Sequence, residues 1–341
     1  MLEYSFITYL VLFNLFFLIN FNYISRILNL YDHPDHKRKI HNKKISCIGG
    51  VFIFVNLTIF FVFYLFFDEN FVSKNFFEIQ FSSFIFFYIS LAIIFLMGLL
   101  DDKYSLKPNI KILILSLTVI FLLITDQNLR VSFLRFSFLN NVYDISNFSI
   151  FFTTLCMLVF INAFNMYDGS NLQVSSISIV IFLYLLIVQN SIDYFLITLI
   201  VSLAIFSFLN FKNKLFLGDN GSLVLSFIIC YVFIKLYSKG IIFYADQVCL
   251  FMILPVIDLL RVFIVRIYNG KSPFEPDRNH IHHILISRFN IYYTQLILFS
   301  IYLVPVSFGF FTQKFFISII FQIIIYLVIY LNFRKKKKNV K

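Results

Sequence analysis

Five short polar clusters interrupt a chain that is otherwise strongly apolar. They read DHPDHKRKIHNKKISCIGG at 32–50, GLLDDKYSL at 98–106, NAFNMYDGSN at 162–171, FLGDNGS at 216–222 and SPFEPDRNHIHHIL at 272–285. Carboxylates suit Mg²⁺, basic side chains suit phosphate oxygens, and glycines let a ligand approach the backbone closely. This combination favours phosphoryl-transfer chemistry.

The acidic residues are the first candidates for that chemistry. Asp101 and Asp102 directly follow an apolar run, where two carboxylates oppose the dipole at a helix C-terminus. A catalytic role is therefore favoured over a solvated helix end. Asp219, between Gly218 and Asn220, is a candidate metal ligand, with an ordinary turn as the alternative because Asp-Asn-Gly is good turn chemistry.

A second candidate feature is a stripe of polar residues three positions apart, made of Asn162, Asn165 and Asp168. Asparagine is costly inside a membrane unless it pairs with another polar group or lines a cavity. Hydrogen bonds between helices are the alternative explanation. Because Asp168-Gly169 follows the stripe at the end of its apolar run, we predict that the stripe belongs to a site.

The histidine-rich cluster provides basic groups. His280, His282 and His283, together with Arg278, lack an acidic or thiol complement for zinc, and they fit anion binding better. Asp258 and Arg261 stand three residues apart in an apolar run and are interpreted as a structural ion pair.

The composition indicates a polytopic membrane protein. Of the 341 residues 60% are hydrophobic and 13% charged, and the mean hydropathy is +0.88. The four cysteines have no metal-binding spacing, and the first apolar run has neither a basic flank nor a cleavage site, so we expect it to be a retained span. The net charge of +11 requires no nucleic-acid partner if it reflects membrane topology.

Eleven apolar runs are long enough to cross a bilayer. They lie near 4–25, 49–67, 77–99, 109–125, 147–165, 173–190, 194–211, 221–238, 246–268, 291–311 and 315–333. The predicted fold is all-α: a bundle of about eleven transmembrane helices in one catalytic domain, 1–333, followed by a basic cytoplasmic tail, 334–341. The segment 126–146 between two runs could form a short hairpin or an amphipathic piece.

Basic residues predict the orientation. With the tail in the cytoplasm, 22 of the 28 lysines and arginines fall on that side, and the other side keeps Lys74, Arg130, Arg135, Lys235, Lys239 and Lys314. All five polar clusters fall on the cytoplasmic side as well. We therefore predict one active site at the cytoplasmic face, built from loops that a rigid bundle holds.

These clusters, in this order, resemble those of the polyprenyl-phosphate N-acetylhexosamine-1-phosphate transferases, a bacterial family in glycosyltransferase family 4 that includes undecaprenyl-phosphate GlcNAc-1-phosphate transferases. The likeness runs from Asp32 to about Leu285, and SPFEPDRNHIHHIL is its most specific part. It implies an enzyme of the bacterial inner membrane that uses a UDP-sugar donor, a polyprenyl-phosphate acceptor and Mg²⁺, with Mn²⁺ as an alternative. Such an enzyme releases UMP in the first membrane step of a lipid-linked cell-surface glycan, and a homodimer is left open.

The resemblance also implies roles for individual residues. Asp101, Asp102 and Asp168 match catalytic acids, and Asp219 matches a Mg²⁺ ligand. The predicted nucleotide-binding residues are Asn162, Asn165, Asn171 and Phe216; the predicted phosphate-binding residues are Arg278, His280, His282 and His283; and Arg38, Lys39 and His41 match basic residues of the first loop. The chain departs from the family pattern at Asn171, where an aspartate is usual, and at Ser46, where proline is frequent.

The expected reaction is attack of the lipid phosphate on the sugar-linked phosphorus of the donor, which leaves the C1–O bond intact. A route through a covalent aspartyl phosphate is an alternative. The competing function is a transporter or flippase for a phosphorylated lipid, but transporters place polar residues at the bilayer midplane and often contain inverted repeats, and no repeat is visible here. A non-catalytic relative of the same fold is a third alternative, which the retained acids disfavour.

Overall fold

The computed structural model describes residues 2–34, 44–66, 81–189, 192–273 and 277–334. The predicted first-loop residues Arg38, Lys39 and His41 lie outside these ranges.

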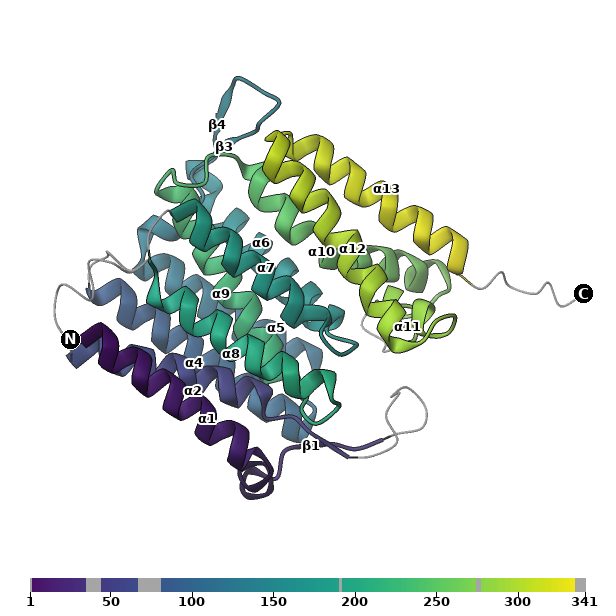
Figure 1. The fold of residues 1–341 in the computed structure, drawn as a ribbon. Coiled ribbons are helices and arrows are strands. Elements are labelled where there is room, and N and C mark those ends of the chain that lie inside the picture. Colours follow the sequence, from purple (N-terminus) through teal and green to yellow (C-terminus); the bar gives the residue numbers. More distant parts are fainter. Residues whose placement is uncertain (1, 35–43, 67–80, 190–191, 274–276, 335–341) are drawn as a thin grey trace, which may run out of the picture.

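Within these described ranges, eleven long helices correspond to the eleven apolar runs, and they form one bundle (Figure 1). They are α1 (Leu2–Leu28), α2 (Gly49–Phe66), α4 (Phe81–Tyr104), α5 (Pro108–Thr125), α6 (Ser149–Tyr167), α7 (Gln173–Gln189), α8 (Tyr194–Phe211), α9 (Gly218–Ser238), α10 (Ala245–Tyr268), α12 (Ile291–Thr312) and α13 (Phe315–Phe333). A short helix, α11 (Ile281–Ile286), lies in the histidine cluster. The predicted all-α membrane fold is thus confirmed.

The prediction of eleven spans is confirmed for ten helices. Within the described residues, ten helices are long and apolar enough to cross a membrane, whereas α7 has only 17 residues. At 1.5 Å per residue α7 is about 25 Å long, shorter than a hydrocarbon core of about 30 Å. It packs against α8 and α12, so neighbouring helices cover much of its surface.

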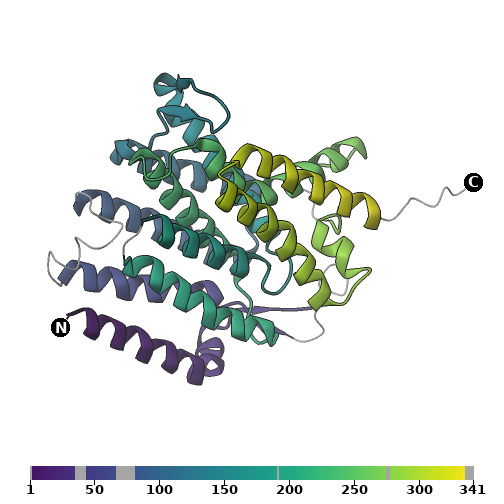
Figure 2. The same cartoon turned by 45° about the horizontal axis from the view of Figure 1, so that its top comes forward.

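Helix α9 is the centre of the bundle and carries the FLGDNGS cluster at its start. In its most apolar stretch 89% of the residues are buried, against 22% for α1, and it packs on α2, α4 and α6. Figure 2 shows α1 and α13 on opposite flanks of the bundle. The most buried helix therefore begins at the polar cluster, which places that cluster in the middle of one end of the molecule.

Two glycines bring the helix ends at this cluster unusually close together. A Cβ on Gly98 of α4 would lie 2.3 Å from Cα of Asn220, and one on Gly50 of α2 would lie 2.3 Å from the backbone N of Gly221. Both distances are far below van der Waals contact, so only glycine fits. The first, second and fourth polar clusters are packed together in this way.

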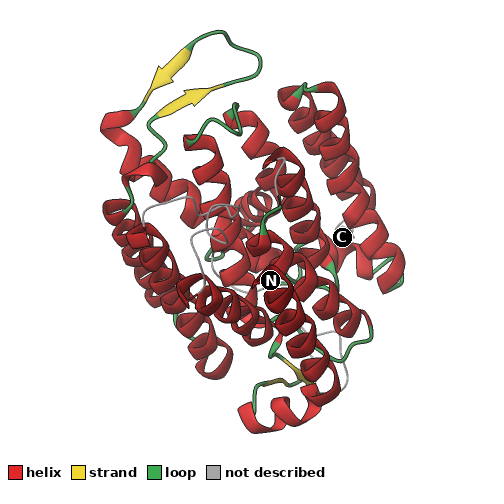
Figure 3. Cartoon of the chain, turned by 60° about the vertical axis from the view of Figure 1, so that its left-hand side comes forward, coloured by secondary structure: helices red, strands yellow, loops and turns green. Residues whose placement is uncertain are grey.

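Short strands lie at the two ends of the bundle (Figure 3). β3 (Phe133–Arg135) pairs antiparallel with β4 (Val142–Asp144), which confirms the hairpin considered for 126–146. At the other end β1 (Tyr31–Asp32) pairs antiparallel with β2 (Ile45–Ser46). Two single turns of 3-10 helix, Gln127–Leu129 and Ser146–Phe148, flank the hairpin. In Figure 1 the start of α1 and the end of α13 lie at opposite ends of the bundle, as an odd number of crossings requires.

Candidate active site

A cavity of about 1140 Å³ opens at the end of the bundle that carries β1, β2 and α11. Residues from all five polar clusters line it, including Asp32, Asp101, Asp102, Asp168, Asn171, Phe216, Asp219, Asp277, His280, His282 and His283. The five clusters thus converge on one cavity at one end of the bundle, and that this cavity is the active site stays a prediction.

Two of the predicted acids share a lysine that the sequence analysis did not single out. Lys111 of α5 forms an ion pair with Asp101 Oδ2, and its Nζ lies 3.6 Å from Asp219 Oδ2. The side chain of Asp101 is 2% exposed, whereas that of Asp219 is 42% exposed. Asp101 also accepts a hydrogen bond of 2.8 Å from the backbone N–H of Leu106. Asp101 is therefore a buried partner of the lysine, and Asp219 is the carboxylate that opens to the cavity.

A signal for Lys111 was present in the sequence. It is a lysine inside an apolar run, and such a residue needs an acidic partner or a polar cavity.

Asp102 caps the start of α9. Its Oδ1 accepts the backbone N–H of Asp219 at 2.7 Å, and its Oδ2 accepts the backbone N–H of Asn220 at 3.2 Å and the Asn220 side-chain amide. The first N–H groups of a helix have no partner within the helix, and a carboxylate there also suits the helix dipole. Asp102 thus orients the segment that carries Asp219.

The first loop fixes the position of Phe216. The backbone N–H of Phe216 donates to Ser46 O at 2.7 Å, and the N–H of Gly49 donates back to Phe216 O at 3.1 Å. Ser46, where the family often has proline, is buried and accepts a hydrogen bond from the Ser25 hydroxyl at 2.8 Å. This bond and the β1–β2 pairing hold the loop without the proline.

The polar stripe on α6 reaches the cavity only at its end. Asn162 donates to Leu158 O of its own helix at 2.8 Å, and Asn165 accepts from the Ser222 hydroxyl on α9. Neither asparagine lines the cavity, so the structure does not bring these two predicted nucleotide-binding residues to it. They match the alternative explanation, in which the stripe makes local and interhelical hydrogen bonds.

Asn171 lies in the cavity wall and is held from two sides. Its amide donates to Asn213 Oδ1 at 2.6 Å, and its backbone O accepts from Gln295 of α12. Asn210 of α8, also in the wall, accepts the N–H of Leu172 at 2.6 Å. Asn210 was missed by sequence reasoning because its contacts are tertiary. The role of Asn171 toward a nucleotide base stays a prediction.

Asp168 has an unusual protonation equilibrium. Burial, together with the nearby negative charge of Asp102, raises its pKa to about 7. Asp168 therefore titrates near neutral pH, where a group can both accept and release a proton. This behaviour is consistent with the predicted catalytic role.

The three histidines line the cavity, as predicted, while Arg278 is exposed and does not line it. Arg266 of α10 lines the cavity instead: its Nε and Nη2 each lie 3.0 Å from an oxygen of Asp277. Burial opposes ionisation of Asp277, but the bonds from Arg266 and Asn279 hold its pKa below the usual range. The arginine of this site thus comes from a helix rather than from the histidine cluster.

His282 is tightly enclosed. It is 2% exposed, and a Cβ on Gly169 would lie 2.0 Å from its Nε2. Burial, and then the neighbouring His283 and His280, hold its pKa well below the usual range, so the ring is neutral at physiological pH. Among the described residues its Nδ1 has no hydrogen-bond partner. A neutral imidazole of this kind can donate one hydrogen bond and accept another.

A metal ion would bind at this site together with the phosphates of a substrate. Within the described ranges no three His, Cys, Asp or Glu side chains gather as a ready-made metal centre. Mg²⁺, however, is commonly held by one or two carboxylates, waters and the phosphates of a substrate. The exposed carboxylate of Asp219, which faces the cavity, fits that mode of binding.

The fold and the cavity define a polytopic helical membrane protein that gathers carboxylates, histidines and an arginine around one cavity at the end of its bundle. Residues 84–237, which run from α4 to α9, match the family model described as glycosyl transferase family 4. The matched segment covers 154 of the 341 residues, and over it the chain is similar to this family.

The chain is also similar to curated proteins along most of its length. It is 28% identical over 296 residues to the undecaprenyl-phosphate alpha-N-acetylglucosaminyl 1-phosphate transferase of Thermotoga maritima, covering 86% of this chain and 85% of that one. The protein of the same name from Escherichia coli O157:H7 is 25% identical over 287 residues, covering 81% and 74%. A probable undecaprenyl-phosphate N-acetylglucosaminyl 1-phosphate transferase of Bacillus subtilis is 27% identical over 263 residues, covering 75% and 69%.

Proposed function

We propose that this protein is a membrane enzyme that transfers a sugar 1-phosphate, an N-acetylhexosamine 1-phosphate, from its UDP-linked donor to a polyprenyl phosphate. The observation that carries the proposal is the convergence of all five polar clusters on one cavity at the end of the bundle. The names of the related proteins support the same reaction. Nothing in the comparisons supports the alternative of a transporter.

The reaction is a displacement at phosphorus. An oxygen of the lipid phosphate forms a bond to the sugar-linked phosphorus of the donor, and the bond from that phosphorus to the bridging diphosphate oxygen breaks. UMP leaves with the bridging oxygen and its electron pair. The product is a sugar joined to the lipid through a diphosphate, and the sugar C1–O bond is never broken.

The acids and Lys111 have different roles in the proposed reaction. Lys111 lies between Asp101 and Asp219, where its ammonium group offsets their negative charge and holds both carboxylates in place at the cavity. Asp219 would hold Mg²⁺, which when bound supplies positive charge against the diphosphate. Asp168, with a pKa of about 7, can accept a proton from a singly protonated acceptor phosphate.

The histidines suit the donor side of the cavity. His282 is neutral and buried, and His283 stands beside it with ring centroids 4.2 Å apart. Their N–H groups would donate to diphosphate oxygens, and Phe216 offers a ring on which a base can stack.

An apolar groove gives the polyprenyl tail a place. It lies between α1, α2 and α4, has a volume of about 840 Å³, and is lined by residues such as Val55, Phe95 and Leu99. Leu30 lines both the groove and the polar cavity, and Leu99 stands two residues before Asp101. A lipid with its phosphate in the cavity could therefore lay its isoprenoid chain in the groove, so we assign the groove to the acceptor tail.

The cavity is proposed to face the cytoplasm, in the inner membrane of a bacterium. Most lysines and arginines lie in the loops on the same side of the bundle as the cavity, which supports this orientation. UDP-sugars are made in the cytoplasm, so the orientation also matches the proposed donor.

One assay tests the proposed function. Purified protein in detergent is incubated with undecaprenyl phosphate, Mg²⁺ and a panel of UDP-N-acetylhexosamines, and UMP release is followed. We expect UMP and a lipid-linked sugar diphosphate in equal amounts, both dependent on the acceptor. Release of free sugar phosphate, or no UMP from any donor in the panel, would contradict the proposal.

The groove assignment has its own test. Val55→Trp narrows the groove, and Leu117→Trp adds the same side chain on α5, at a position that is 59% exposed. We expect Val55→Trp to raise KM for undecaprenyl phosphate several-fold and to change KM for a short-chain farnesyl phosphate much less. If Val55→Trp and Leu117→Trp change KM equally, or if Val55→Trp changes KM equally for the long and the short acceptor, the tail lies elsewhere.

A further inference from the structure

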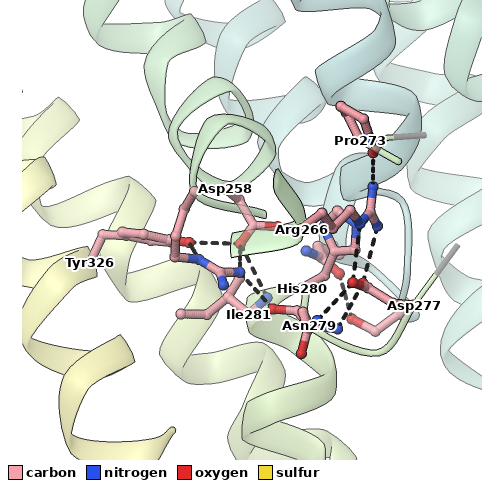
Figure 4. A network of polar contacts seen from close by, with 11 residues as sticks. Asp258, Arg266, Pro273, Asp277, Asn279, His280, Ile281 and Tyr326 are labelled. Atoms are coloured by element: carbon pink, nitrogen blue, oxygen red, sulfur yellow. Dashed lines mark hydrogen bonds and ion pairs between the residues drawn. The ribbon is translucent and has the colours of Figure 1, made fainter. Parts of the chain in front are cut away.

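Asp258 of α10 is a buried carboxylate that helps to fasten the histidine loop to the bundle (Figure 4). Its Oδ2 lies 2.7 Å from Nδ1 of His280, and its Oδ1 accepts the backbone N–H of Ile281 at 3.1 Å. Ile281 begins α11, and His280 at the N-cap offers no side-chain cap of its own. Asp258 therefore takes the place of the missing cap.

The carboxylate is itself held by two further groups. Arg261 donates to Oδ1 from 2.7 Å, and the hydroxyl of Tyr326, on α13, donates to the same oxygen from 2.7 Å. Arg261 also donates to the Tyr326 oxygen at 2.5 Å and to the backbone O of Asn279 at 2.7 Å. Because donors occupy the carboxylate from several directions, it cannot rotate without losing hydrogen bonds, which fixes its direction toward His280.

This contact determines which ring nitrogen of His280 can serve the cavity. A carboxylate accepts hydrogen bonds, so Nδ1 carries a proton whether the ring is neutral or charged. His280 lines the cavity, and with Nδ1 engaged only Nε2 is left to contact a ligand. Partners of this kind fix the tautomer and the orientation of a functional histidine.

We propose that Asp258 is a positioning residue that acts through His280: it directs Nε2 of His280 toward the donor diphosphate, to which the protonated ring donates a hydrogen bond. The inference rests on the proposed function. It goes beyond the structural ion pair with Arg261, because the second oxygen of Asp258 is committed to the histidine. Asp258 itself makes no contact with substrate in this arrangement.

The test compares two buried carboxylates of the same helix. Asp258→Asn places an amide against His280, and Asp246→Asn makes the same change at the far end of α10, where Asp246 accepts from the N–H of Ser137 at 2.9 Å. We expect Asp258→Asn to lower kcat about 10- to 100-fold, the range found for hydrogen-bond partners of metal-bound histidines, with a small change in KM for the donor. Asp246→Asn should keep its turnover per folded molecule.

A double substitution separates positioning from general destabilisation. If Asp258 acts through His280, Asp258→Asn combined with His280→Ala should be no slower than His280→Ala alone. Losses that multiply in the double variant, or equal turnover in Asp258→Asn and Asp246→Asn, would overturn the inference.

A measurement without turnover keeps the inference testable if the wild-type protein releases no UMP. In protein labelled with ¹⁵N-histidine, the signals absent from His280→Ala identify His280. We expect its Nδ1 to be protonated in the wild-type protein and the proton to move to Nε2 in Asp258→Asn. A wild-type ring with unprotonated Nδ1 would refute the positioning role, whereas missing UMP release refutes only the proposed function.

Discussion

At the scale of single residues, Asp219 is the acid whose role is easiest to isolate. Its side chain is 42% exposed to the cavity, unlike the buried Asp101. We expect Asp219→Asn to lower turnover by at least about 10²-fold, since it removes the charge of a hard oxygen ligand. Higher Mg²⁺ should restore part of the activity. Asp144→Asn, an exposed carboxylate in β4, is the control and should behave as wild type.

Near-normal activity of Asp219→Asn at low Mg²⁺ would mean that FLGDNGS only forms a helix start. In that case the positive charge beside Asp101 would come from Lys111 rather than from a bound Mg²⁺.

Asp168 predicts a pH dependence. Its pKa of about 7 means that the carboxylate form grows as the pH rises through neutrality. If this carboxylate accepts the acceptor's proton, kcat should rise with pH between about 6 and 8, and Asp168→Asn should remove that limb of the profile. Asp102 is the charged neighbour of Asp168, and it stays in place in this variant. If kcat of Asp168→Asn still rises with pH over this range, another group is responsible for the rise.

Gly169 is predicted to matter through His282. A methyl group there would lie 2.0 Å from the ring, so Gly169→Ala must displace the histidine or the loop. We expect Gly169→Ala to lower turnover about as much as His282→Ala, and the two together to be little worse than either one. Ser170→Ala is the matched control, because the Ser170 hydroxyl donates to Gln173 Oε1 at 2.9 Å, within the same turn of the chain. Full activity of Gly169→Ala would show that His282 need not stand where the structure has it.

At the scale of elements, the start of α9 distinguishes the roles of Asp102 and Asp219, which line the same cavity. Asp102 accepts two backbone N–H groups of α9, so Asp102→Asn leaves donors without a full set of acceptors. We expect a loss of about 1–3 kcal/mol in the free energy of unfolding, together with a loss of turnover. Asp219→Asn should lose turnover and keep its melting temperature. Equal melting temperatures for the two variants would contradict the capping role.

At the scale of the whole molecule, the orientation in the membrane is testable. Reporter fusions after residue 145, in the loop that follows β4, and at residue 341 should report opposite sides of the membrane. The prediction follows from the eleven helices and from the skew of basic residues. The same side for both fusions would mean that α7 does not cross.

The sequence by itself determined the helices, because runs of about twenty apolar residues have few other ways to satisfy their backbone in a membrane. It also indicated which clusters would meet at one cavity, since polar groups next to a bilayer persist where they have partners or a function. These local properties sufficed to bring Asp101, Asp168, Asp219 and the three histidines to the cavity wall.

Only the tertiary structure decided what each polar group faces. Lys111 joins two acids, Arg266 rather than Arg278 lines the cavity, and Asn162 turns back to its own helix. Asp258 was expected to pair with Arg261 three residues along, yet it also holds His280, 22 positions away. The reason is physical: periodicity describes neighbours on one helix, whereas hydrogen-bond partners in a bundle come from helices that pack together regardless of their separation in the chain.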